Sequence, residues 1–185
     1  MVQEVMQRHG RLYAPANDER LYHAATAVTG VAPGTSLSTT AGFALHNPAG
    51  SGVELAIQRV KMGYISGTLG AGSVFHAANQ VPVLATPAGT AIVPIPARIN
   101  GAVPAKAKPL TTATVVAPTV LRPFCSLGAS LATTPEAPWI VAEDVDGEFL
   151  IPEGCTYILH AVTAAGTSPL VAYGVTWEEI AAGVA

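Results

Sequence analysis

From Arg20 onward, apolar and polar residues follow one another in short segments that favour strands over helices. The segments are rich in Val, Ile, Thr, Leu and Tyr, and clusters of Gly, Pro, Asn and Ser separate them. Because no strand alternates with a helix of about ten residues or more, a parallel α/β fold is excluded. We predict strands over residues 21–31, 36–46, 53–64, 111–116, 120–126, 148–151, 156–163 and 170–177.

The third of these segments has the clearest alternation. Apolar side chains recur at every second position over residues 53–57 and again over residues 60–64, but the two sets are out of phase. Since successive side chains of a strand point to opposite faces, the change of phase requires one extra residue. We therefore predict a long, bent strand with a bulge at Gln58 or Arg59.

The pattern also predicts which of the other segments pair, and which lie at the edges of the sheets or in loops. Residues 111–116 and 120–126 are expected to pair with each other, and residues 156–163 and 170–177 to form a central antiparallel pair. Residues 178–182 are the only ones with helical character, for about one turn. Three short segments beside prolines suit sheet edges or loops, namely residues 74–77, 82–85 and 91–95.

Together these elements predict an all-β fold. Roughly eight to ten short strands joined by Gly/Pro turns favour an antiparallel β-sandwich, jelly-roll-like in topology. Residues 1–19 carry a breaker cluster at positions 14–18 and no sustained period, so we expect an extended N-terminal arm. With 185 residues in all, residues 20–185 are expected to form one β-sandwich domain around a single core.

The composition suggests that this domain does not work alone. Charged residues make up 11% of the chain, against about 25% in an average soluble domain, while 50% are hydrophobic and the mean hydropathy is +0.41. The longest uncharged stretch, residues 62–97, is interrupted by glycines and prolines and cannot form a spanning helix. Abundant aliphatic residues argue against disorder. We therefore expect neighbouring subunits to cover the excess apolar surface.

Charge is distributed unevenly along the chain. No acidic residue lies between Glu54 and Glu136, a span with six basic residues, whereas eight acidic residues and no basic ones follow Arg122. The two segments either pair within one subunit or meet head to tail on neighbouring copies. A nucleic-acid partner is not expected, because the six basic residues lack interleaved aromatic residues and form no dense patch. The first ten residues show no secretory signal, which favours a cytosol-like compartment.

No catalytic, cofactor-binding or metal-binding residues are predicted. Residues 67–72 and 47–52 contain several glycines but match neither nucleotide-binding pattern, so both are interpreted as turns or loops. No Gly-x-Ser-x-Gly motif is present. The histidines are not spaced as metal ligands on one element; they are His9, His23, His46, His76 and His160. We accordingly expect no cofactor and no enzymatic activity.

Two further sets of residues have competing interpretations. Cys125 and Cys155 match no zinc spacing and are expected to be buried free thiols, with a disulfide as the alternative. The apolar surroundings of Cys125 should raise the pKa of its thiol. A cluster of acids is interpreted as an exposed loop before a strand, rather than as an acid/base pair or a calcium site; it comprises Glu143, Asp144, Asp146 and Glu148.

Two segments resemble structural proteins of tailed bacteriophages. Residues 43–55 read Phe-Ala-Leu-His-Asn-Pro-Ala-Gly-Ser-Gly-Val-Glu-Leu, and residues 172–179 read Ala-Tyr-Gly-Val-Thr-Trp-Glu-Glu. In those proteins an x-L-x-N-P-x-G-S-G turn joins two sandwich strands, and a G-x-T-W-E-E strand closes the chain. The resemblance leaves residues 81–136 unmatched and carries no catalytic residues. It implies a virion component: a head decoration or cement protein, a minor capsid protein, or a fibre or tail module.

We therefore expect a non-enzymatic virion structural protein, assembled in the cytoplasm of the bacterial host. It would act as a homo-oligomer, with a trimer as the expected size, and contact the major capsid protein. A tail-fibre or receptor- or carbohydrate-binding module is the alternative, but it requires exposed aromatic residues, and Tyr64, Tyr173 and Trp177 fall on strand faces. A metal-dependent enzyme of the cupin type is a third hypothesis.

Overall fold

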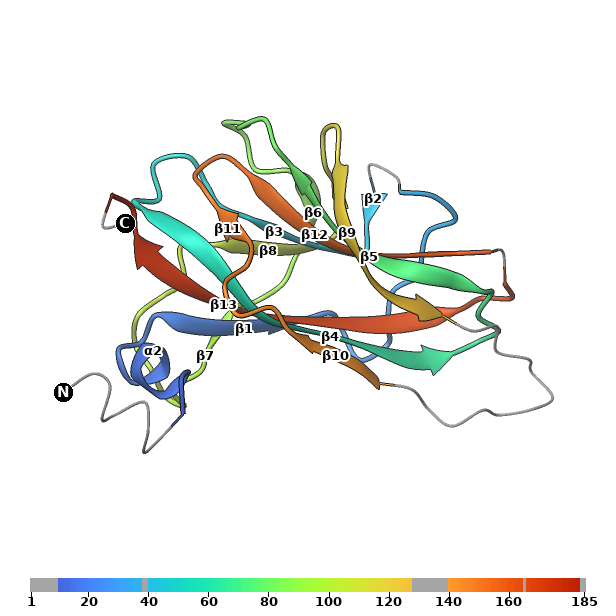
Figure 1. Cartoon of the computed structure of the whole chain (residues 1–185), viewed down its shortest axis with the longest axis horizontal. Coiled ribbons are helices and arrows are strands. Elements are labelled where there is room, and N and C mark those ends of the chain that lie inside the picture. Colours follow the sequence, from blue (N-terminus) through green and yellow to red (C-terminus); the bar gives the residue numbers. More distant parts are fainter. Residues whose placement is uncertain (1–9, 38–39, 128–139, 165, 184–185) are drawn as a thin grey trace.

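The strands divide between two antiparallel sheets that face each other (Figure 1). The computed structural model describes residues 10–37, 40–127, 140–164 and 166–183. Sheet A runs in the order β10 (Ile140–Asp144), β4 (Val53–Ser66), β13 (Leu170–Ala181), β1 (Leu21–Ala25) and β7 (Ile95–Pro96), and β11 (Leu150–Ile151) also pairs with β4. Sheet B runs in the order β2 (Thr40–Ala41), β8 (Lys108–Thr114), β3 (Phe43–His46), β12 (Thr156–Thr163), β5 (Gly72–Asn79) and β9 (Thr119–Leu127), and β6 (Ala88–Ala91) pairs with β8.

Eight of these strands have the connectivity of a jelly roll. One layer contains β1, β13, β4 and β10 as neighbours, and the other contains β3, β12, β5 and β9. Along these eight strands, the chain passes from one layer to the other after β1, β3, β4, β9, β10 and β12. Strands β5 and β9 are the only two in succession that belong to the same layer. The predicted all-β, antiparallel and jelly-roll-like sandwich is confirmed.

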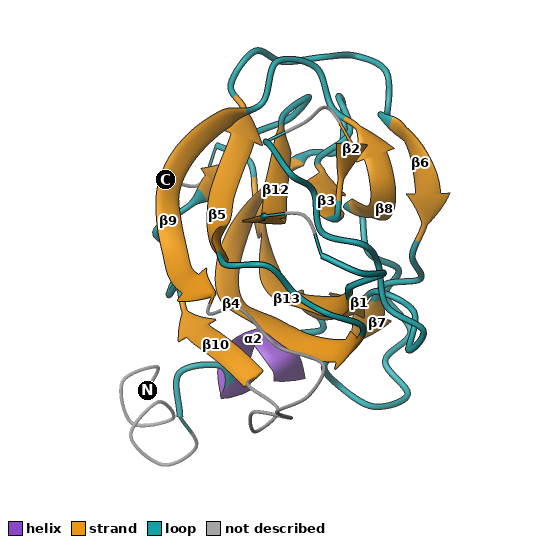
Figure 2. Ribbon diagram, turned by 90° about the vertical axis from the view of Figure 1, so that its right-hand side faces the viewer, coloured by secondary structure: helices purple, strands orange, loops and turns teal. Residues whose placement is uncertain are grey.

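The connection between β5 and β9 departs from the eight-stranded pattern. Residues 80–118, which we call the insertion, contain β6, β7 and β8. Strand β8 pairs with β3 in sheet B, while β7 pairs with β1 in sheet A. The insertion therefore extends both sheets along the same side of the sandwich, on the right in Figure 2.

The core lies between the two sheets and is built mainly from large side chains. Trp177 stacks on Tyr22 with ring centroids 5.9 Å apart, and both are at most 1% exposed. Phe43, Tyr157 and Tyr173 complete the aromatic part of this core. A second, smaller cluster covers the outer face of sheet B; it consists of Ala41, Ala44, Ala77, Leu110, Ala113, Val115 and Ile158.

The predicted bulge lies in β4. In the pairing of β4 with β13, Arg59 is opposite Thr176 and Ile57 is opposite Trp177, so Gln58 is the extra residue. Both halves of the strand consequently direct their apolar side chains into the same core. The prediction is confirmed, with Gln58 as the bulged residue.

Three predictions about strand pairing are wrong. The last two strands, β12 and β13, belong to opposite sheets, and β8 and β9 are separated by β3, β12 and β5. Residues 74–77 belong to β5, an interior strand between β12 and β9 rather than an edge or a loop. The nearest proline, Pro82, follows the strand and removes no ladder hydrogen bond from it. By contrast, residues 82–85 form a loop. Residues 91–95 are also a loop except at their ends, where the edge strand β6 finishes at Ala91 and the two-residue strand β7 begins at Ile95.

The helical prediction is also wrong in its position. Residues 178–181 continue strand β13, because the backbone of Glu179 pairs with Leu55 and its side chain points into the core. The described residues have one helix instead, α2 (Tyr13–Asn17), inside the predicted arm. Arg11 forms ion pairs with Asp144 and Asp146, so this part of the arm contacts its own subunit.

Candidate functional site

A histidine-centred network joins the edge strand β9 of sheet B to the edge strand β10 of sheet A; both strands are on the left in Figure 2. His76 on β5 is fully buried; its Nδ1 lies 2.6 Å from the Tyr157 hydroxyl and its Nε2 lies 2.9 Å from Glu143 Oε2. Arg122 on β9 donates from Nη2 to Glu143 Oε1 at 2.7 Å. Since Glu143 belongs to sheet A and the other three residues to sheet B, the network clamps one edge of the sandwich.

Aromatic side chains surround the buried histidine of this network, while Glu143 and Arg122 remain partly exposed. The Phe149 ring lies 5.0 Å from the His76 ring and 5.3 Å from the Arg122 guanidinium, and Phe124 contacts His76 at 5.4 Å. Burial lowers the pKa of His76 and raises that of Tyr157 well above its usual value. The hydrogen bonds that Arg122 donates to Glu148 and Glu143 raise the pKa of its guanidinium.

The network has the components of a proton relay but not the access. A histidine between a hydroxyl and a carboxylate is the arrangement that activates a nucleophile in many hydrolases. Here the hydroxyl belongs to Tyr157, which is 0% exposed, so no substrate reaches it. We interpret the network as a structural clamp.

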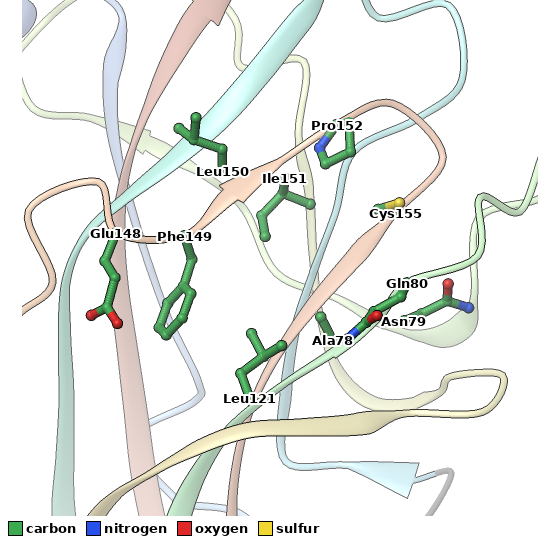
Figure 3. Close-up of a pocket in the computed structure, with 10 residues that line it drawn as sticks. All are labelled: Ala78, Asn79, Gln80, Leu121, Glu148, Phe149, Leu150, Ile151, Pro152 and Cys155. Atoms are coloured by element: carbon green, nitrogen blue, oxygen red, sulfur yellow. The ribbon is translucent and has the colours of Figure 1, made fainter.

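The neighbouring pocket offers no better reactive group. It has a volume of about 320 Å³ and lies between β11 and the ends of β5 and β9 (Figure 3). Its walls include the apolar side chains of Leu121, Phe149 and Ile151, and the carboxylate of Glu148 at its rim is bound by Arg122 Nη2 at 2.7 Å. Cys155 also lines it, and burial raises the pKa of that thiol, which makes it a poor nucleophile.

The two glycine-containing segments serve close backbone packing. Residues 67–71 connect β4 with β5, and a Cβ atom at Gly67 or Gly72 would lie 2.1 Å from a backbone oxygen of the segment 162–168. In residues 47–52, the backbone N–H groups of Gly50 and Gly52 donate to the Glu153 carboxylate at 2.9 and 2.7 Å. Because the chain's own carboxylate fills the position of an anion, this segment is the predicted turn and not a phosphate site.

The other described histidines each have a different contact and do not form a common site. His23 on the outer face of sheet A contacts Thr176, His46 contacts Thr156, and His160 Nδ1 accepts a hydrogen bond from Gly42. His9 lies outside the described residues. Within the described part of the chain, no three His, Cys, Asp or Glu side chains are grouped as metal ligands would be.

The cysteines are both unpaired, as expected, although only Cys155 is fully buried and Cys125 is partly exposed. Burial raises the pKa of the Cys125 thiol, which confirms the direction predicted from its apolar surroundings. A disulfide, the alternative interpretation, is not formed.

The acidic cluster is only in part the exposed loop before a strand that the sequence suggested: Asp146 and Glu148 are exposed in the turn that precedes β11. Glu143 and Asp144 belong to β10, which the sequence did not predict as a strand. Glu143 is bound by Arg122 and Asp144 by Arg59, so basic residues of the middle segment pair with acidic ones of the C-terminal segment inside one subunit. This is the first of the two interpretations given for the uneven charge distribution.

The aromatic residues do not form an exposed sugar-stacking surface in the described part of the chain. Tyr173 and Trp177 are in the core, as their strand positions predicted, and Tyr64 packs against it. The described residues contain no helix with the length and apolar character needed to cross a bilayer.

The most unusual surface lies on the insertion. Among the described residues, twelve large hydrophobic side chains are exposed, and seven of these belong to the insertion: Val81, Leu84, Val93, Ile95, Ile99, Val103 and Val116. Leu84 is 89% exposed and Ile99 is 93% exposed. Scattered single exposed hydrophobic residues are ordinary, but a concentration of them in one segment indicates an interaction site.

Comparison with known proteins assigns no family to the chain. No protein-family model matches it, and neither a curated protein nor a solved structure matches it.

Proposed function

We propose that this chain is a non-enzymatic structural subunit of a tailed-bacteriophage virion, a decoration or cement protein that binds the capsid as a homo-oligomer. The observation that carries the proposal is the exposed apolar surface of the insertion on a jelly-roll sandwich. An isolated subunit would leave this surface in water, whereas a subunit of an assembly buries it.

The polar groups support a structural role. The buried His76 and Tyr157 bind each other, and the carboxylates around them are bound by Arg122. A catalytic site requires reactive groups that a substrate can reach. The polar residues of this network instead hold strands together, which suits a subunit that must resist mechanical and thermal stress.

The low number of charges fits the same role. Charged residues make up 11% of the chain, and several of the described ones pair within the subunit, for example Arg59 with Asp144 and Arg20 with Glu178. Such pairs leave few charges to keep separate copies apart in solution. A virion component meets its partners at high local density, where this property favours assembly.

The direct test compares phage particles assembled with and without the protein. We expect particles that lack it to lose a set of surface densities in electron microscopy and to release DNA at a lower temperature or after a milder osmotic shock. Restoring the purified protein should restore both properties. Unchanged densities and unchanged resistance would contradict the proposal.

A further inference from the structure

We propose that residues 81–105 of the insertion form the surface on which a second copy of this chain packs. The inference rests on the proposed function in that a homo-oligomer is part of it, and it names the surface that holds the oligomer together. In this segment Arg98 is the only charged residue, and its guanidinium already pairs with Glu19 at 3.3 Å. The exposed side chains are otherwise mainly Val, Leu, Ile, Pro and Ala.

The segment is held in place by carboxylates of other elements. Glu19 Oε2 accepts hydrogen bonds from the backbone N–H groups of Ala102 and Val103 at 3.0 and 3.1 Å. The buried Glu179 of β13 accepts from the N–H groups of Lys106 and Ala107, both at 2.9 Å. These bonds fix the end of the segment, so its apolar side chains are displayed on an ordered backbone.

Further contacts fix the rest of the segment. The N–H groups of Val83, Ile92 and Ala97 donate to carbonyls of other segments at 2.8–2.9 Å. Five prolines restrict the backbone further; they are Pro82, Pro87, Pro94, Pro96 and Pro104. An ordered surface loses little conformational entropy when a partner binds, which favours a permanent interface over a flexible loop.

Strand β6 adds an open sheet edge to the apolar side chains. Its four residues, Ala88–Ala91, are all exposed, and in the described part of the chain it pairs only with β8. Free edges of natural sheets are commonly protected by charged residues or prolines within the strand. Strand β6 has neither within it, although it is short and its pairing with β8 is irregular between Ala88 and Thr90, so it offers a short stretch of unpaired backbone to a partner.

The segment also lines an apolar groove. A groove of about 450 Å³ lies beside β6 and β8 and is lined mainly by apolar residues, including Ile92, Pro94 and Leu110. Leu84 and Ile99 protrude from the same segment. A chain with both the apolar projection and the apolar groove can associate head to tail, and such contacts close into rings when the rotation allows.

The size and chemistry of the surface favour a second copy over an unrelated protein. The 25 residues of the segment match the roughly 20–30 residues that one partner contributes to an interface of standard size. Interfaces between identical subunits are more apolar than those between proteins that also exist separately. Arg98, which is partly exposed and pairs with Glu19, is the single charge that the segment presents for recognition by a different partner.

The test measures the mass of the full-length protein by sedimentation velocity, from low to high micromolar concentration. We expect the wild type to associate, and Ile99→Asp and Leu84→Asp each to raise the dissociation constant about tenfold or more, because a carboxylate would be buried against apolar groups. Val28→Asp is the matched control: Val28 is 90% exposed but lies outside the insertion. It should associate as the wild type does.

Hydrogen exchange locates the contact independently of any substitution. The amides of residues 88–91 should exchange more slowly as the protein concentration rises. The inference would be overturned if the wild type stays monomeric, or if all variants associate equally. It would also be overturned if Val28→Asp weakens association as strongly as Ile99→Asp, or if amides elsewhere are protected while those of β6 are not.

The experiment separates this inference from the proposed function. A protein that associates through residues 81–105 but does not bind phage shells would keep the inference and contradict the function. A monomer that binds and stabilises shells would contradict the inference and the oligomeric part of the proposed function, but would keep the role as a decoration or cement protein. Association only after capsid protein is added would show that the surface serves a different partner and would overturn the inference.

Discussion

The core strands of the sandwich and residues 81–105 of the insertion are both rich in hydrophobic residues, but their side chains lie in opposite environments. In the sandwich, Phe43, Tyr157 and Trp177 are 0% exposed. In the insertion, Leu84 and Ile99 are 89% and 93% exposed. Apolar composition alone therefore does not predict burial in this chain.

The difference follows from the pattern of the residues. Strands β4 and β13 alternate apolar with polar or small residues, so that one face of each strand enters the core. Residues 81–105 of the insertion have apolar residues without alternation and a proline every few positions, so their backbone turns too often to place one face inward. None of these residues is fully buried, whereas Leu110, Ala113 and Val115 farther along the insertion are buried against sheet B.

The largest expected effect is in the sandwich. Trp177→Ala should lower the free energy of unfolding by about 3–5 kcal/mol, because it leaves a cavity beside Tyr22 and removes a buried indole. Urea unfolding followed by circular dichroism measures this change. Leu84→Ala serves as the contrast and should change the stability by less than about 0.5 kcal/mol. Equal losses in the two variants would contradict the division between a buried and an exposed apolar region.

A second prediction concerns the hydrogen bonds by which Glu179 of the sandwich holds the backbone of the insertion. Glu179→Ala removes the acceptor for the backbone N–H groups of Lys106 and Ala107 and for the Trp177 indole. We expect a loss of about 2–3 kcal/mol, since buried donors would be left without a partner. Hydrogen exchange at residues 106 and 107 should become faster. Glu179→Gln keeps one acceptor oxygen and should lose less, and equal exchange in wild type and alanine variant would show that the carboxylate does not hold the insertion.

The sequence predicts the parts of this architecture that depend on local alternation. The bulge at Gln58 was recognisable because a change of phase is visible within one segment. The partners of β8 and β9 were not recognisable, because pairing depends on how the strands are ordered in space, and the sequential neighbours lie in different parts of sheet B. Helical propensity at residues 178–181 was overridden by the pairing of β13 with β4.

The candidate site was less predictable than the fold. His76, Tyr157 and Glu143 come from three strands that are far apart in the sequence, and no short motif links them. The only sequence signal was a histidine at an inward position of an apolar strand, with a matching acid and arginine elsewhere. The apolar surface had a clearer signal: residues 81–105 contain one charged residue and no sustained alternation. That combination predicts exposed hydrophobic residues better than it predicts strands.

A third prediction uses acid to loosen the clamp within the sandwich. Burial holds the pKa of His76 below its usual value of about 6.5, the charge of Arg122 also lowers it, and the bond to Glu143 opposes the shift. The folded protein therefore binds fewer protons than the unfolded chain below that pH. The contribution of His76 to stability is complete above pH 6.5 and is lost as the pH falls toward the folded-state pKa, by at most about 1.4 kcal/mol per pH unit.

The measurement compares urea unfolding of the wild type and of His76→Gln between pH 7.5 and about pH 5. The free energy of unfolding should decrease in both proteins as the pH is lowered, because burial also lowers the pKa values of His46 and His160. The slope should be smaller in the variant, and identical slopes would contradict a neutral, buried His76. Below this range, the pKa values of Asp144 and Glu148 are held low by Arg59 and Arg122, so a further loss is expected once those carboxylates are protonated.

The smallest expected effect tests the exposed region itself. In Ile99→Ser, the change in unfolding free energy should stay within about 0.5 kcal/mol when both proteins are dilute, because the side chain is 93% exposed and makes little contribution to the core. At high concentration the proteins should differ. Association adds to the stability of the wild type by mass action, so its urea midpoint should rise with protein concentration, while the midpoint of the variant should rise less. A concentration-independent midpoint in the wild type would mean that the hydrophobic residues of the insertion stay in water, and the contrast between the two regions would then have no consequence for assembly.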